Sequence, residues 1–175
     1  ENEKCSIRTF DFSHFTFHNK KNVQISFEKF IKQNPLKQID PDIYAPIDLA
    51  SSISKMYVVS DHIILTFDTD FTKTQAFDLN IKSGGVEEKT FNLPDYKTPS
   101  PTSNSFYSDN KLFQMKATKE SFLFDIKDFN SGKIIKNYSF SKNDTIPFKN
   151  SPFLMQIDNG KPRQLKTTDK FLKNI

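Results

Sequence analysis

The stretch Ser60-Asp61-His62-Ile63-Ile64-Leu65 is followed 48 residues later by a similar one, Ser108-Asp109-Asn110-Lys111-Leu112-Phe113. In each, a polar turn opens an apolar run of the kind that forms a buried strand. Phe77-Asp78-Leu79 recurs 47 residues further on as Phe124-Asp125-Ile126, and the turn glycines Gly85 and Gly132 are also 47 residues apart. A repeat of this length with strand-like content predicts a β-sheet unit that occurs at least twice, as in the blades of a propeller.

The first unit, at about 55–93, has the pattern of four strands in a row. Alternating and continuous apolar runs predict these strands at 56–59, 62–67, 74–81 and 86–93. A polar loop at 68–73 separates the second strand from the third, and Lys82-Ser83-Gly84-Gly85 predicts the last hairpin turn. The unit is therefore expected to be an antiparallel four-stranded meander.

A second unit at about 105–140 repeats this order after a linker at 94–104 that holds three prolines. Its strands are predicted at 105–107, 111–117, 121–127 and 133–140. Because the third strands match by sequence, Phe77 and Phe124 are expected to occupy equivalent inward positions.

The remaining segments flank these two units. A partial unit at 145–167 contains one hairpin turn at Asp158-Asn159-Gly160, and residues 1–54 form an irregular N-terminal segment. We therefore predict a single β-rich domain over 1–175. Its units pack as in a β-propeller, of which the chain is a part, or as a β-sandwich or an open barrel.

Composition supports an all-β fold with a large aromatic core. The 175 residues include 19 Phe and 5 Tyr but no Trp and only 4 Gly. Phe, Tyr and β-branched residues favour strands. The net charge is +4, and the charged side chains, 26% of the chain, are interspersed in sign. No basic stripe with base-stacking aromatics is evident, so no nucleic-acid partner is expected.

The repeated order of Ser-Asp-(His/Asn), apolar strand, loop, Phe-Asp-(Leu/Ile) and Gly-containing turn resembles the blades of TolB-like six-bladed β-propeller proteins of Bacteroidetes. The resemblance covers about residues 45–141, with a weaker echo at 145–167. A six-bladed ring needs roughly 250 residues, so only two to three blades are present. The resemblance implies a binding or scaffolding role in an exported protein, located in the periplasm, at the cell surface or outside the cell. It carries over no catalytic residues.

Residues that could perform chemistry are few. His14, His18 and His62 have no accompanying cluster of carboxylates or cysteines, so no zinc site is expected. Asp68-Thr69-Asp70 resembles the start of a calcium loop but lacks the glycine and the distant glutamate. The single cysteine, Cys5, excludes an internal disulfide, and no apolar run approaches 18 residues, so no transmembrane segment is expected. We predict no enzymatic activity, no metal and no cofactor.

The predicted function is that of a non-catalytic binding or scaffold module that recognises a protein or a glycan through loops. The candidate contact residues lie in two loops: Asp68, Thr69, Asp70, Phe71, Lys73, Asp95, Tyr96 and Lys97. The alternatives are a secreted ligand-binding or inhibitor-like barrel or sandwich, and an enzyme with an unrecognised site. A cavity inside one closed sheet would favour the former, and a cleft with two carboxylates or a His–carboxylate pair would favour the latter.

Overall fold

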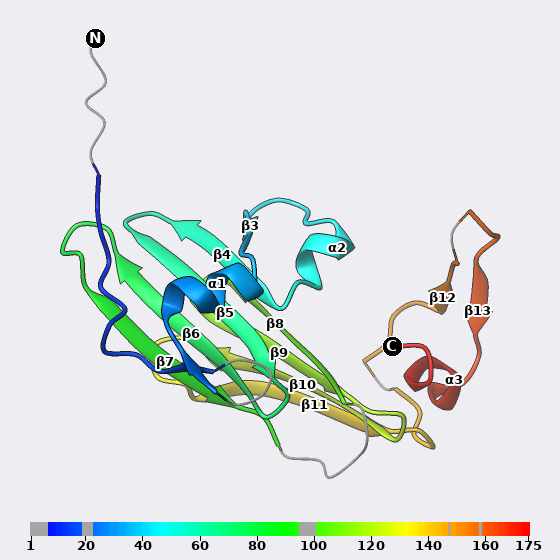
Figure 1. Ribbon diagram of the computed structural model, residues 1–175. Coiled ribbons are helices and arrows are strands. Elements are labelled where there is room, and N and C mark those ends of the chain that lie inside the picture. The colour runs from blue at the N-terminus through cyan, green and yellow to red at the C-terminus, as the bar shows by residue number, and fades with distance from the viewer. Residues whose placement is uncertain (1–6, 19–22, 95–100, 147, 158) are drawn as a thin grey trace.

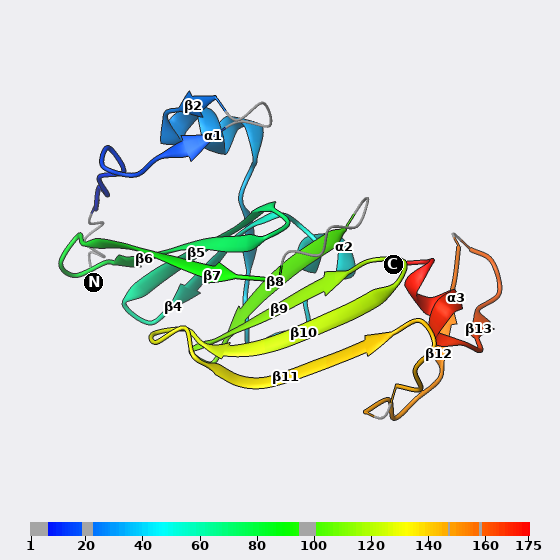
Figure 2. The ribbon, with the colours of Figure 1, turned by 90° about the horizontal axis from the view of Figure 1, so that it is seen from below.

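Two stacked sheets make up the body of the chain, and the N-terminal and C-terminal segments lie against them (Figure 1, Figure 2). The computed structural model describes residues 7–18, 23–94, 101–146, 148–157 and 159–175. Strands account for 46% of the described residues and helices for 10%. These proportions confirm the predicted all-β class.

The first sheet contains five strands. Their order across the sheet follows the chain: β3 (Lys37–Ile39), β4 (Ser54–Val59), β5 (His62–Asp70), β6 (Lys73–Asn80) and β7 (Val86–Asn92). β3 runs parallel to β4, and every other neighbouring pair is antiparallel. The strands β4 to β7 form the predicted four-stranded meander.

The second sheet is a meander of four antiparallel strands. It is built from β8 (Thr102–Ser108), β9 (Lys111–Ala117), β10 (Ser121–Asp128) and β11 (Ile134–Ser141). The prediction of two antiparallel meander units is therefore confirmed.

The prediction of a loop at 68–73 is wrong. β5 continues through Asp70 and β6 begins at Lys73, so only Phe71 and Thr72 form the turn. Polar residues predict a loop only where they are exposed to water. Asp68 lies in a strand and is buried, and its carboxylate is satisfied by hydrogen bonds from other parts of the fold.

The N-terminal segment covers one face of the first sheet. It contains β1 (Phe17–His18), β2 (Gln24–Ile25) and α1 (Phe27–Gln33), and α2 (Ile47–Ala50) follows β3. Ser26 caps α1 by accepting a hydrogen bond from the Lys29 N–H. Phe27, Phe30 and Ile31 share one side of this helix and pack on the sheet.

The C-terminal segment is a small hairpin and a helix. β12 (Phe153–Met155) pairs with β13 (Arg163–Leu165), and α3 (Thr168–Leu172) follows. Phe153 and Phe171 stack on each other with ring centroids 3.9 Å apart. Phe171 also contacts Phe122 and Phe140, which attaches the segment to one end of the second sheet.

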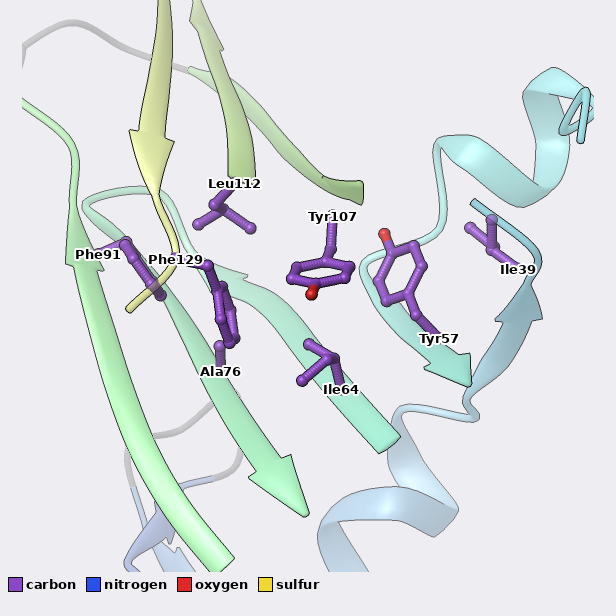
Figure 3. Packing of buried hydrophobic residues seen from close by; sticks show 8 residues of the cluster. All are labelled: Ile39, Tyr57, Ile64, Ala76, Phe91, Tyr107, Leu112 and Phe129. Atoms are coloured by element: carbon purple, nitrogen blue, oxygen red, sulfur yellow. The ribbon is translucent and has the colours of Figure 1, made fainter. Parts of the chain in front are cut away.

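The two sheets enclose a hydrophobic core of large side chains (Figure 3). The first sheet contributes Tyr57, Ile64, Ala76 and Phe91, and the second sheet and its turn contribute Tyr107, Leu112 and Phe129. A separate aromatic cluster lies between the first sheet and the N-terminal segment, and it is centred on Phe17, Phe30, Leu65, Phe67, Phe77 and Leu79. We call the side of the first sheet that carries Ile64 its front face and the side that carries Leu65 its back face.

The repeat is real, but its register differs by one residue from the match between the two sequence stretches. Val59↔His62 closes the β4–β5 hairpin and Ser108↔Lys111 closes the β8–β9 hairpin, so these copies are 49 residues apart. In the third strands the offset is 48, since Leu65 pairs with Phe77 and its counterpart Gln114 pairs with Asp125. The turn that follows keeps this offset: Gly84 and Gly132 both have positive φ, and both donate a hydrogen bond to the residue four positions earlier. The equivalent turn glycine is therefore Gly84 and not Gly85.

This shift overturns the expected equivalence of Phe77 and Phe124. With an offset of 48 in the third strand, the counterpart of Phe77 is Asp125. Since successive side chains in a strand point to opposite faces, a slip of one residue exchanges the faces. Phe77 is fully buried under the N-terminal segment, whereas Phe124 lies on the side of the second sheet that faces away from the first.

The sheets stack head to tail. Hydrogen bonds connect β5 to β8, β6 to β9 and β7 to β10, so strand order runs the same way in both layers. Leu112 and Gln114, which face the first sheet, are the counterparts of Ile63 and Leu65 on its back face. The front face of the first sheet thus packs on the back face of the second, which is a heterologous arrangement.

Candidate functional site

Asp68, the first of the predicted contact residues, is an internal structural group. Its Oδ1 accepts a hydrogen bond from Thr74 Oγ1 at 2.7 Å. Its Oδ2 accepts hydrogen bonds from Lys55 Nζ at 3.1 Å and from the backbone N and Oγ of Ser105 at 2.9 and 2.8 Å. The carboxylate therefore joins β4, β5, β6 and β8, and no part of it is available to a partner.

The other residues of this predicted loop form a tight, exposed turn. Asp70 Oδ1 accepts hydrogen bonds from the Thr72 backbone N at 2.8 Å and from Thr72 Oγ1 at 2.7 Å. Leu93 N donates to Thr72 O at 2.6 Å, which fixes the turn to the end of β7. Phe71 lies at the tip with 50% of its surface exposed. Thr69 and Lys73 are also exposed.

The second predicted loop is not described. Asp95, Tyr96 and Lys97 lie outside the residues that the structure describes. The structure therefore brings together only the residues around Phe71 as a candidate contact site.

A buried polar network between the sheets was not recognised in the sequence. Gln114 Nε2 donates to Thr74 Oγ1 at 2.9 Å and to Phe91 O at 3.1 Å, and Gln114 Oε1 accepts from Lys127 Nζ at 2.7 Å. Lys127 Nζ also donates to Asn92 O at 2.6 Å and lies 3.3 Å from Asp125 Oδ2. The available signal was the presence of Gln114, Asp125 and Lys127 at alternate positions in strands with apolar neighbours.

The network fixes the lateral position of one sheet on the other. A slide of either sheet would leave buried ammonium and carboxylate groups without partners, which costs several kcal/mol. Burial lowers the pKa of the Lys55 ammonium below its ordinary value, and the nearby Asp68 carboxylate opposes this shift. The two stacked sheets that carry the turns are thus held in one arrangement by polar contacts as well as by the hydrophobic core.

A His–carboxylate pair is present at the opposite end of the strands. His62 Nδ1 lies 2.5 Å from Asp78 Oδ1, and Asn80 Nδ2 lies 3.4 Å from His62 Nε2. Both ring nitrogens are therefore engaged by neighbouring side chains. Neither His62 nor Asp78 lines either of the two hollows described below.

Two hollows among the described residues lie in the flanking segments. One, of about 640 Å³, is open to solvent and is lined by apolar Phe12, Phe15, Ile25 and Phe27 together with Ser13, Gln24, Ser26 and Glu28. The other, of about 520 Å³, lies between the segment after β11 and the β13–α3 region, and Lys142, Lys149 and Lys166 contribute to its lining.

No group of three or more His, Cys, Asp or Glu side chains is placed to hold a metal ion in the part of the chain that the structure describes. Within the same residues, no helix has the length and apolar character needed to cross a membrane.

Comparison with known proteins finds no match: no family model, no curated protein and no solved structure is similar to the chain at a significant level.

Proposed function

We propose that the chain is a non-catalytic binding or scaffold module of an exported bacterial cell-envelope protein, and that it contacts its partner through exposed turns on a repeated β-sheet framework. The observation that supports this best is Phe71, a half-exposed aromatic ring at the tip of a turn that is anchored on both sides.

An anchored turn is a favourable site for recognition. Loops on a rigid scaffold commonly carry binding residues, and aromatic side chains supply a large share of binding energy at interfaces. Because Asp70 and Leu93 already hold the turn, little conformational entropy would be lost when a partner binds. The flat ring suits an apolar pocket of a protein or the face of a sugar ring, in keeping with a protein or glycan partner.

The cell-envelope location depends on the resemblance of the repeat to TolB-like propellers. The head-to-tail stacking of two meander sheets is in keeping with this resemblance, because successive blades of a propeller also pack unlike faces together.

The test compares two exposed aromatic residues. Phe71→Ser should leave the melting temperature nearly unchanged and weaken binding to bacterial envelope proteins or to an array of bacterial glycans by about tenfold, or about 1.4 kcal/mol. Tyr44→Ser is the matched control, because Tyr44 is 87% exposed and lies in the segment between β3 and α2. Equal binding by the wild type and by Phe71→Ser would contradict the proposal.

A second candidate function is the binding of a small apolar ligand in the aromatic hollow of the N-terminal segment. The hollow presents Phe12, Phe15 and Phe27 beside polar Ser13 and Glu28, which is the usual character of a ligand site. Ser13→Trp should fill the hollow and abolish binding of an apolar fluorescent probe. Probe binding that is absent in the wild type, or unaffected by Ser13→Trp, would contradict this candidate.

A further inference from the structure

The front face of the second sheet, which points away from the first, is strongly apolar. Its central side chains come from three adjacent strands and are only partly buried: Phe113, Met115, Phe124, Ile126 and Tyr138. The strand register places them side by side, since Phe124 pairs with both Met115 and Tyr138, and Ile126 pairs with Phe113. The rings of Phe113 and Tyr138 both lie 6.3 Å from that of Phe124. We call this set the outer patch.

The outer patch is more apolar than the equivalent face of the first sheet, although that face is covered and the patch is not. The structural repeat gives each patch residue a counterpart on the covered face: Ile64 for Phe113, Thr66 for Met115, Ala76 for Phe124, Asp78 for Ile126 and Lys89 for Tyr138. A face that stays in water would be expected to be the more polar of the two. Contiguous exposed apolar patches instead mark interaction sites. The patch therefore has the composition of an interface.

Among the residues that the structure describes, the C-terminal segment covers one end of this face. The ring of Phe122 stacks on Phe140 and contacts Phe171 of α3, and Tyr138 contacts Phe148. Phe113, Met115 and Ile126 have no part in the apolar cluster that forms around the C-terminal segment. The described residues therefore leave the centre of the outer patch open to an occupant.

We propose that the occupant is a second copy of this chain, and that two outer patches pack face to face as a two-fold symmetric dimer. The repeat shows what kind of surface fits here, because the equivalent face of the first sheet is covered by a four-stranded sheet of the same type. Two apolar sheet faces pack well at the usual separation of about 10 Å.

Symmetry favours the face-to-face arrangement over an extending stack. A head-to-tail contact between copies would need a free back face. The back face of the first sheet is covered by the N-terminal aromatic cluster, and that of the second sheet by the first sheet. The outer patch is therefore the open sheet face that a second copy can present, and an isologous pair of this kind closes as a dimer.

Charge does not oppose this pairing. The centre of the patch carries no ionisable group apart from the tyrosine. Lys136 lies at the edge of the patch, opposite Ile126 in the strand register. At the end of the patch, Lys111 of β9 and Asp128 of β10 occupy facing register positions and carry opposite charges. No like charges would be buried at the middle of the interface.

The experiment is sedimentation equilibrium of the full chain between about 1 and 100 μM. The expected species is a dimer of twice the 20.3 kDa chain mass, and Met115→Lys should weaken association by at least about tenfold. Val58→Lys is the matched control: Val58 is 48% exposed in β4 of the first sheet, outside the patch, so this variant should remain dimeric. Circular dichroism confirms that each variant is folded.

A second measurement uses the wild type alone and does not depend on the folding of a variant. Amine cross-linking with mass spectrometry should join Lys136 of one copy to Lys136 or Lys111 of the other. A monomeric wild type at 100 μM, a dimer that Met115→Lys leaves intact, or intermolecular cross-links confined to lysines outside the patch would each overturn the proposal. None of these outcomes depends on the Phe71 turn.

Discussion

Lys55 and Asp68 form an ion pair between the two neighbouring strands β4 and β5, with Nζ 3.1 Å from Oδ2 and with side chains that are 0% and 2% exposed. Lys55 Nζ also donates to Asn104 Oδ1 at 2.6 Å, and Asn104 Nδ2 donates to the carbonyl of Ala50. The pair thereby links the first sheet to the second sheet and to α2. A buried pair of this kind contributes more to a unique arrangement than to net stability.

Asp68→Asn should destabilise the protein by about 3–5 kcal/mol, because it leaves the Lys55 ammonium buried without a counter-charge. Urea denaturation would measure the loss. Asp61→Asn is the control: Asp61 pairs with Lys82 at 2.6 Å, but both side chains are largely exposed, so its effect should stay within about 1 kcal/mol. Similar losses in the two variants would show that Asp68 is not buried as described.

Tyr57 predicts a specific loss of stability at alkaline pH. Burial raises the pKa of its hydroxyl well above the ordinary value of 10.0. The unfolded chain releases this proton near pH 10 while the folded chain retains it, so stability is complete below pH 10 and falls as the pH rises beyond it. Tyr57→Phe lacks the proton, and its advantage over the wild type should grow by up to about 1.4 kcal/mol per pH unit. Urea midpoints at pH 8 and pH 11 would test this, and a constant difference would contradict it.

The arrangement of strands could be predicted from the sequence, but their register could not. Apolar alternation and turn residues are local signals, and they identified both four-stranded meanders. Register depends on the residue that closes each hairpin. The first hairpin turns at Ser60-Asp61 and its counterpart at Asp109-Asn110, although the similar letters Ser-Asp occur one residue earlier in the second copy.

The candidate site was only partly predictable for a related reason. The polar residues Thr69 and Asp70 that follow Asp68 predict an exposed loop, and the neighbours of Asp68 in the chain do not reveal that it is buried. The groups that satisfy it include Ser105, which lies 37 residues away in another sheet. Such a long-range partner leaves no trace in local periodicity, whereas the exposure of Phe71 at the turn follows from position alone.

The register finding predicts unequal effects of two Phe→Ala changes. Phe77 is 0% exposed, and Phe77→Ala should cost about 3–5 kcal/mol. Phe124 is only partly buried in the outer patch, so Phe124→Ala should cost less than half as much. Equal losses in urea titrations at a concentration below 1 μM, where a dimer makes little contribution, would restore the equivalence expected from the sequence.

Gly132 allows backbone strain to be measured separately from steric contact. Its φ is +69° and a Cβ atom built there would meet nothing within 4 Å. Gly132→Ala should therefore cost about 1–2 kcal/mol through the left-handed conformation alone. Asn tolerates this conformation better, so Gly132→Asn should be less destabilising than Gly132→Ala. The thermal midpoints of the two variants would decide, and the reverse order would contradict the assigned turn.

Replacement of the whole segment 68–73 by a Gly/Ser loop should unfold or strongly destabilise the protein. The replacement removes the carboxylate that accepts from Lys55, Thr74 and Ser105, and with it the polar link between the sheets. It also places flexible residues in the last part of β5, where backbone order is costly for Gly.

Phe71→Ser changes only the tip and should leave the melting temperature within about 2 °C, since surface substitutions usually act by less than about 0.5 kcal/mol. Differential scanning calorimetry of both variants gives the comparison. Equal stability of the two would mean that Asp68 makes no contribution to the frame, and the rigid support proposed for the Phe71 turn would then be lost.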